Sequence, residues 1–227
     1  MTAQDWPHVV LATERLVLRP WRDEDAEALY ELARDPRVGS AAGWPPHASV
    51  AESRQTIRDV LSTPYTFAMF ERVADEDAAA INASAARACD VPVSNVREEA
   101  APASDVSSAV QEAASQVSAT AGRLVGCIGL TAVRHVDADD VLEMELGYWL
   151  GVPFWGKGYM TEAARELVRF GFDDLGLSTI WACYFDGNER SKHVMERLGM
   201  TYHHVQDCKE RTGGAHDLEH VMVLRRP

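Results

Sequence analysis

The N-terminal part of the chain has the apolar pattern of one strand followed by two helices. Leu16 and Leu18 lie two positions apart within residues 14–20, which is the spacing of one face of a strand. Asp23 precedes apolar residues at helical spacing, so we expect it to cap the first helix. A second helix is expected to begin with a capping box at Ser49, and its predicted buried residues are Ile57, Val60 and Leu61.

Three strands are predicted around a long segment rich in alanine, serine and acidic residues that follows the second helix. Tyr65, Phe67 and Met69 alternate before the segment, and residues 124–130 form a continuous apolar run after it. Residues 141–150 then alternate apolar and polar side chains, which is typical of a half-buried strand. A glycine- and proline-rich loop leads from that strand into a helix.

The C-terminal part alternates between helices and strands. The helix after the loop has an apolar stripe that includes Ala164 and Leu167, so one of its faces is expected to cover the sheet. A strand over residues 179–185, a helix that ends at Gly199 and two closing strands complete the order. This order predicts an α/β (α+β) fold, with one mixed sheet covered by helices in a single domain over residues 1–227.

Residues 74–121 interrupt the pattern with a composition unlike the rest of the chain. Of these 48 residues, 16 are Ala and 7 are Ser, and none is aromatic. Eight acidic and two basic residues give the segment −6 of the net charge of −13. So few bulky apolar side chains offset little of the entropy of ordering, and Pro92 and Pro102 would interrupt a long helix. We therefore expect a disordered or transiently helical insertion that lengthens the turn of a β-hairpin.

Composition and charge exclude several function classes. The 227 residues are 46% apolar and 25% charged, as in an ordinary globular protein, and no apolar run approaches the roughly 20 residues that cross a bilayer. The N-terminus shows no secretory signal and the four cysteines are widely spaced, so we expect a cytoplasmic protein with reduced thiols and no membrane partner. The negative charge argues against a nucleic-acid partner. The eight histidines show no metal-binding pattern, so no metal is expected.

The glycine-rich turn before the helix is the first chemical signal in the sequence. Gly156 and Gly158 let the backbone approach a phosphate, and a helix N-terminus supplies free N–H groups. A Walker A motif fits poorly, because position 158 is glycine where a hydroxyl residue is needed. The dinucleotide fingerprint also fits poorly, because Thr161 stands where the third glycine is required. A tight connection that binds no ligand stays an alternative.

Several stretches in a fixed order resemble the GNAT superfamily, and within it the ribosomal-protein N-acetyltransferase group, RimJ/RimL-like. They are GYWL at 147–150, FWGKGYMTEA at 154–163, NERS at 188–191 and LGM at 198–200, and TERLVLRP at 13–20 fits the first strand of that group. The resemblance covers almost the whole chain apart from residues 74–121. It implies a mixed, mostly antiparallel sheet flanked by helices and the activity of an acetyl-CoA-dependent N-acetyltransferase.

The resemblance also implies where acetyl-CoA binds, with CoA as the product. The pyrophosphate is expected on the backbone amides from Gly156 to Thr161, and the pantetheine arm along the strand edge near Leu150. Trp155 is usual in the RimJ/RimL-like group, whereas Met160 replaces a small residue of the family pattern. The implied cofactor-binding residues are Trp149, Leu150, Trp155, Gly156, Lys157, Gly158, Tyr159, Met160, Thr161, Asn188 and Ser191.

Acetyl transfer to an amine needs a base for the ammonium proton and an acid for the leaving thiolate. Glu143 and Glu145 share one face of the strand over residues 141–150, so either carboxylate, or a water molecule, could take the proton. The resemblance places a carboxylate two residues before Gly-Tyr-Trp, which favours Glu145. It also places Ser191 near the thiol sulfur, and many relatives use a tyrosine where this chain has Met195.

The acceptor is expected to bind among the early helices and loops, with Tyr30, Trp44 and Glu143 as candidate contacts. These residues do not identify a substrate, so the acceptor is either a protein N-terminal amine or a small polyamine- or aminoglycoside-like amine. Asn188 either contacts the cofactor or serves as a helix cap alone. The oligomeric state is left open between monomer and homodimer.

The predicted function is direct transfer of an acetyl group from acetyl-CoA to a primary amine in a ternary complex. Glu145 and Ser191 are the expected catalytic residues. The alternative is a non-catalytic CoA- or acyl-CoA-binding module whose insertion binds a partner, and Met160 and Met195 are the features that favour it. A nucleotide-triphosphate enzyme is a more distant alternative.

Overall fold

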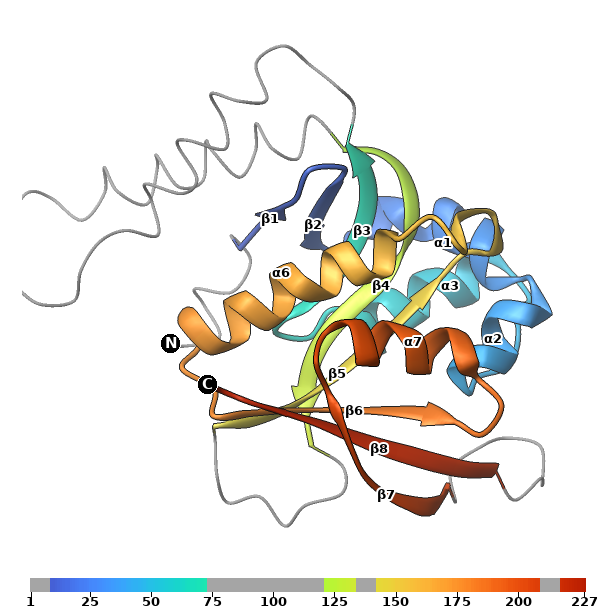
Figure 1. The fold of residues 1–227 in the computed structure, drawn as a ribbon. Coiled ribbons are helices and arrows are strands. Elements are labelled where there is room, and N and C mark those ends of the chain that lie inside the picture. The colour runs from blue at the N-terminus through green and yellow to red at the C-terminus, as the bar shows by residue number, and fades with distance from the viewer. Residues whose placement is uncertain (1–8, 73–120, 134–141, 209–216) are drawn as a thin grey trace, which may run out of the picture.

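The computed structural model describes residues 9–72, 121–133, 142–208 and 217–227, which form one sheet with helices on both faces (Figure 1). The predicted insertion, residues 74–121, lies outside the described residues except for Ala121. The strands are β1 (Leu11–Ala12), β2 (Leu16–Pro20), β3 (Thr66–Arg72), β4 (Ala121–Ala132), β5 (Glu143–Leu150), β6 (Thr179–Phe185), β7 (Thr201–Cys208) and β8 (Asp217–Arg225). The α-helices are α1 (Ala26–Ala33), α2 (Pro36–Ala42), α3 (Val50–Thr56), α6 (Tyr159–Asp173) and α7 (Glu189–Arg197).

The sheet is mixed and mostly antiparallel, as predicted. Its strands lie in the order β1-β2-β3-β4-β5-β6-β8-β7, and β5 with β6 is the parallel pair. β3 and β4 pair antiparallel, with Phe67 opposite Ile128. This pairing confirms that the segment between them joins the two strands of a hairpin.

β5 and β6 separate part way along their length. Their ladder ends where Leu146 faces Ala182. β5 continues to Leu150 and stays paired with β4 on its other side, while β6 continues to Phe185 and stays paired with β8. Within the described residues, no strand pairs with the β6-facing edge of β5 beyond Leu146.

Alternate residues of the central strands pack into two hydrophobic clusters on opposite faces of the sheet. Phe67 and Met69 of β3 belong to the cluster that α6 covers, whereas Ala68 and Phe70 belong to the cluster that α1 covers. Figure 1 shows α6 and α7 on one face and α1, α2 and α3 on the other. Because successive side chains of a strand point to opposite faces, their alternation in β3 decides which of them pack under α6 and which under α1.

The start of the first helix differs from the prediction. A 3-10 turn over Asp23–Asp25 precedes α1, and Asp23 caps no helix because it lies inside that turn. Its carboxylate pairs with Arg58 instead. β2 also begins two residues later than predicted, at Leu16, because the Leu16 N–H is bonded to the Thr13 hydroxyl in a tight turn.

The cap of the second helix is confirmed, but one of its predicted core residues is wrong. The Ser49 hydroxyl accepts the main-chain N–H of Glu52, as a helix N-cap does. α3 then widens into a π-helical turn over Ile57–Leu61. Ile57 stays buried and Val60 is 59% exposed, because a π-turn changes the angular spacing on which the prediction rests.

The short helix α2 is not predicted by the apolar pattern. Its start signal is nevertheless present, because the Asp35 side chain accepts the Arg37 main-chain N–H and Pro36 occupies the first helical position. Seven residues are too few to show a helical period. In the C-terminal part, β6 has the predicted bounds, and Gly199 follows the end of α7 with a φ of 82°.

A buried ion pair joins β2 to the turn before α1. The Arg19 guanidinium donates to both carboxylate oxygens of Asp25, at 2.8 and 2.6 Å. Asp25 also accepts the main-chain N–H of Arg22 at 2.9 Å. The Arg19 side chain is 7% exposed and that of Asp25 6%, so neither charge is compensated by water.

We expect Asp25→Ala to lower the free energy of unfolding by roughly 3–5 kcal/mol, because it leaves the Arg19 guanidinium buried without its partner. Urea unfolding measures this loss. The control is Glu31→Ala, which removes the exposed Arg34–Glu31 pair and should have a much smaller effect. Equal losses in the two variants would contradict a special role for the buried pair.

Candidate functional site

A cavity of about 380 Å³ lies where β5 and β6 separate. Its walls are Gly147–Leu150 of β5, Cys183–Phe185 of β6, one face of α7, the end of α2 and the glycine turn before α6. Because β5 lacks a partner strand on this side, the main-chain groups that face this edge over residues 147–150 are available to a bound molecule, apart from the Leu150 carbonyl, which accepts the Trp155 indole N–H. The cavity therefore offers a sheet edge to an amide-containing ligand.

The glycine turn closes one end of this cavity. Gly156 and Gly158 have φ values of 75° and 80°, in the left-handed region that favours glycine. Gly158 is the N-cap of α6, and no side chain caps that helix. The first main-chain N–H groups of α6 are therefore left for a ligand, and the positive end of the helix dipole adds to their attraction for an anion. This donor set fits a pyrophosphate.

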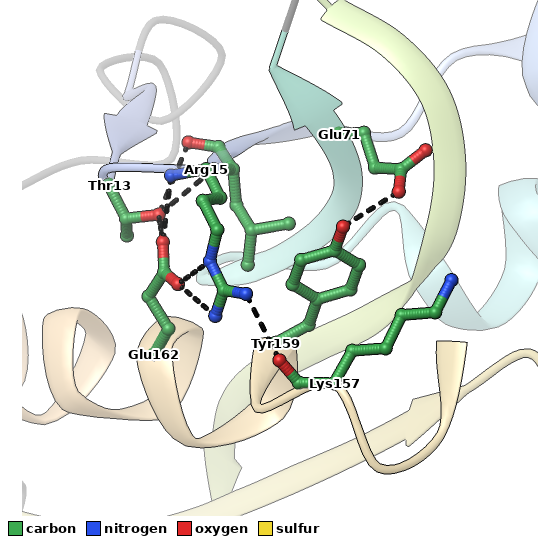
Figure 2. A network of polar contacts seen from close by, with 7 residues as sticks. Thr13, Arg15, Glu71, Lys157, Tyr159 and Glu162 are labelled. Carbon is green, nitrogen blue, oxygen red and sulfur yellow. Dashed lines mark hydrogen bonds and ion pairs between the residues drawn. The ribbon is translucent and has the colours of Figure 1, made fainter.

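The side chains of the turn divide between the cavity and the opposite side. Met160 and Thr161 line the cavity, as does Trp155, whose indole N–H donates to the Leu150 carbonyl at 2.9 Å. Lys157 and Tyr159 are outside the lining: Lys157 Nζ lies 5.4 Å from the Phe154 ring centroid, and the Tyr159 hydroxyl donates to Glu71 at 2.8 Å (Figure 2). Of these predicted cofactor residues, Lys157 and Tyr159 can contribute through their main chain alone.

Three basic side chains of α7 line the cavity near the turn, and the sequence did not single them out. They are Arg190, His193 and Arg197, which recur at the spacing of one helix face. The Arg190 guanidinium lies 4.6 Å from the Trp155 ring centroid. None of the three forms an ion pair with a residue that the structure describes. The charges of Arg190 and Arg197 are available to phosphate groups.

Two carboxylates line the cavity at different levels: Glu145 is level with Trp181, where β5 and β6 are still paired, and Glu219 is level with Phe185 at the end of β6. Glu145 of β5 is 3% exposed, and Glu219 of β8 is 4% exposed and accepts the Gln206 side-chain N–H at 3.1 Å. Sequence reasoning missed Glu219, although it shares the strand parity of the buried residues Val221 and Val223. Met222, of the opposite parity, is buried as well, so parity alone did not mark Glu219 as inward-facing.

Glu143 lies outside the cavity lining. Its carboxylate accepts the Trp181 indole N–H at 2.8 Å. The predicted acceptor residues Tyr30 and Trp44 are also outside the lining: Tyr30 lies beneath the Arg34 guanidinium, and Trp44 packs edge-on against Trp149 with 5.8 Å between centroids. The residues that α2 contributes instead are Val38, Ala41 and Ala42.

Ser191 lines the cavity and is bonded to a tyrosine that sequence reasoning missed. The Tyr148 hydroxyl lies 2.9 Å from Ser191 Oγ and 3.1 Å from the Ser191 carbonyl oxygen. Burial raises the pKa of Tyr148 far above its ordinary value, and the Ser191 hydrogen bond offsets part of the rise. The phenol therefore stays protonated and can donate a hydrogen bond. No spacing rule links a strand residue to a residue in the first turn of a helix so distant in sequence.

Asn188 caps α7, which is one of the two roles that the sequence left open for it. Its side-chain oxygen accepts the main-chain N–H of Ser191 at 3.2 Å, which caps α7, and its amide donates to the Ala41 carbonyl at 3.3 Å. Asn188 also lines the cavity. Met195 is 1% exposed, so this position supplies core packing in place of a hydroxyl.

The described residues contain no group of three or more potential metal ligands and no helix that is long and apolar enough to cross a membrane. Cys127, Cys183 and Cys208 form no disulfide with one another, and burial raises the pKa of Cys127 to about 12. Cys89 lies outside the described residues.

Comparisons with known proteins agree with this geometry. The model of the acetyltransferase (GNAT) domain matches residues 15–201. YdaF of Bacillus subtilis, a candidate ribosomal N-acetyltransferase by name, is 35% identical over 110 residues, which are 46% of this chain. That match covers 56% of YdaF, so the chain spans about half the length of this relative.

Two solved structures have the same fold. The GNAT-family acetyltransferase from Bacillus anthracis is 18% identical with a TM-score of 0.65, and the alignment covers 96% of this chain and 98% of that one. The ribosomal-protein-S5-alanine acetyltransferase from Vibrio fischeri is 15% identical with a TM-score of 0.59, and 96% of each chain is covered.

Proposed function

The chain belongs to the GNAT acetyltransferase family, and from this membership we propose that it transfers the acetyl group of acetyl-CoA to a primary amine by direct attack in a ternary complex. Proteins of this family use acetyl-CoA. The observation that carries the proposal is the cavity between the separated strands, which is lined by the glycine turn with its anion-binding N–H groups and by two buried carboxylates.

The residues that would hold acetyl-CoA are those around the glycine turn and along β5. The N–H groups from Gly156 to Thr161 suit the pyrophosphate, and the edge of β5 over residues 147–150 suits the amides of the pantetheine arm. Arg190 and Arg197 add positive charge at the same end. The bound molecule supplies an activated thioester, and the protein supplies its position.

Glu145 is the base that we propose. An amine acceptor arrives as an ammonium and must lose a proton before its nitrogen can attack a carbonyl carbon. Glu145 is a buried carboxylate of the cavity wall, whereas Glu143 accepts a hydrogen bond from Trp181 outside the lining. Glu219 is the second buried carboxylate of the cavity, and a carboxylate there suits a cationic acceptor.

Ser191 is the proton donor that we propose for the leaving thiolate. Its hydroxyl faces the cavity and lies within hydrogen-bond distance of Tyr148. The Tyr148 phenol donates either to the Ser191 carbonyl oxygen or to Ser191 Oγ, and when it donates to Oγ the serine proton is left to point elsewhere. Tyr148 therefore supports Ser191 as the proton donor, a role that Met195 cannot fill because its side chain has no hydroxyl.

A protein N-terminal amine is the acceptor class that the relatives favour, since YdaF and the Vibrio fischeri protein are both named for ribosomal acetylation. These names also fit the RimJ/RimL-like group. A small polyamine- or aminoglycoside-like amine is the other acceptor class. A cytoplasmic location and the choice between monomer and homodimer stay predictions.

Isothermal titration should show binding of acetyl-CoA to the wild-type protein, and Gly158→Ala should weaken it roughly tenfold, because an L side chain at this φ costs about 1–2 kcal/mol. Gly176→Ala is the control, since Gly176 has a φ of 71° outside the cavity lining. No binding at millimolar acetyl-CoA would overturn the proposal. Binding with no CoA released on any amine of a panel would favour a non-catalytic module.

Glu145→Gln should lower kcat by roughly 10²–10⁴-fold with little change in the affinity for acetyl-CoA, because it removes the base and keeps the shape. The remaining rate should rise with pH, since the acceptor must then lose its proton to solvent. Glu143→Gln is the matched control on the same strand and should keep most of the activity. If Glu143→Gln lost as much rate as Glu145→Gln, the assignment of the base would be wrong.

Tyr148→Phe should reduce kcat, and the fold-loss should be constant from about pH 6 to pH 9, because the raised pKa keeps the phenol protonated throughout this range. Ser191→Ala should cause a larger loss. The pH–rate profiles of both variants test this. A loss in Tyr148→Phe that disappears toward high pH would show that the phenol titrates and would contradict its proposed state.

A further inference from the structure

A network of polar contacts ties the glycine turn to the N-terminal strand region (Figure 2). Glu162, in the first turn of α6, accepts the Thr13 hydroxyl at 2.6 Å, the Arg15 main-chain N–H at 2.8 Å and Arg15 Nε at 2.7 Å. Arg15 Nη1 donates to the main-chain carbonyl of Lys157 at 3.0 Å. One arginine therefore contacts both the helix that follows the turn and the backbone of the turn itself.

The hydrogen bond from Arg15 to the Lys157 carbonyl fixes the direction of the next main-chain amide, the Gly158 N–H. The Lys157 carbonyl and the Gly158 N–H belong to one trans peptide plane, so they point in opposite directions. Arg15 is outside the cavity lining, whereas Gly158 is part of it. The Gly158 N–H thus faces away from Arg15, on the cavity side, and within the described residues it has no hydrogen-bond acceptor.

The guanidinium is held in a fixed orientation by its other contacts. Two of its nitrogens meet the Glu162 carboxylate, and its central carbon lies 4.7 Å from the centroid of the Tyr159 ring. Tyr159 is held in turn by its hydrogen bond to Glu71. A planar guanidinium can donate to the Glu162 carboxylate and to the Lys157 carbonyl at the same time, and a lysine ammonium cannot do so with the same geometry.

The state of Glu162 keeps the network charged. Partial burial opposes its ionisation, but the hydrogen bonds from Thr13 and from the Arg15 main chain and side chain outweigh that effect and lower the pKa of Glu162. Its place in the first turn of α6 also suits a negative charge. The carboxylate is therefore ionised at neutral pH and holds Arg15 in place.

We propose that Arg15 is a positioning residue that fixes the Gly158 N–H toward the pyrophosphate of acetyl-CoA. The inference rests on the proposed function, because the pyrophosphate is the anion that the turn would bind. It gives a role to the Thr-Glu-Arg-Leu segment, which lies far from the glycine turn in sequence. Arg15 itself touches no substrate in this role.

The test compares Arg15→Gln with Arg169→Gln, a control that removes an arginine from the other end of the same helix. Arg15 and Arg169 are both 44% exposed, and each pairs with a glutamate of α6, Glu162 or Glu166. Both variants should unfold in urea at similar concentrations. Arg15→Gln should raise the dissociation constant and the KM of acetyl-CoA roughly tenfold, and Arg169→Gln should leave both unchanged.

A second thioester separates positioning from general damage. S-acetylpantetheine has the thioester and the pantetheine arm but no phosphate, so its kcat/KM should stay within about twofold of wild type in Arg15→Gln. An equal loss of kcat/KM with both thioesters would overturn the proposal, because the defect would then not concern the pyrophosphate. Unchanged binding of acetyl-CoA by Arg15→Gln would also overturn it and leave the proposed function intact.

Arg15→Lys separates direction from charge. It keeps a positive charge beside the turn but cannot reach the carboxylate and the carbonyl with the same geometry, so its affinity for acetyl-CoA should stay near that of Arg15→Gln. Full recovery of affinity in Arg15→Lys would show that charge alone matters and would overturn the positioning role. If the wild-type protein does not bind acetyl-CoA, the proposed function and this inference fail together.

Discussion

The loss of pairing between β5 and β6 is the constraint on which the site depends. The two parallel strands are joined up to Leu146 and Ala182 and then separate, while β4 and β8 continue to hold their outer edges. A strand edge with free backbone groups is normally a liability, because it can pair with another chain. Here the edge lies inside a cavity, beneath α7 and beside the glycine turn, where a ligand can satisfy it.

The cavity contains groups of opposite electrostatic character, although the whole chain is acidic. The glycine turn, the N-terminus of α6 and the arginines of α7 are attractive to phosphates, while the carboxylates Glu145 and Glu219 are attractive to an ammonium. The net charge of −13 therefore says little about the site. What each part of the cavity can bind is decided by a few charged groups that α6, α7 and the strands place there.

Much of the fold follows from local rules in the sequence. Alternation of apolar residues in β3 assigned Phe67 and Met69 to one side of the sheet, and Ser49 and Gly199 marked helix ends that the structure confirms. The errors arose where geometry departs from regular spacing. Val60 is exposed because α3 widens into a π-turn, and Asp23 lies inside a 3-10 turn that no spacing rule anticipates.

The sequence by itself determined most of the elements, their order and the glycine turn, because each depends on neighbours within a few residues, but it missed β1 and α2. It also marked Glu145 and Ser191 through a family resemblance. The tertiary structure alone decided the separation of β5 from β6, the meeting of Tyr148 with Ser191, the inward position of Glu219 and the contact of Arg15 with the Lys157 carbonyl. These features join segments distant in the chain, and such contacts depend on packing directions that a linear pattern does not contain.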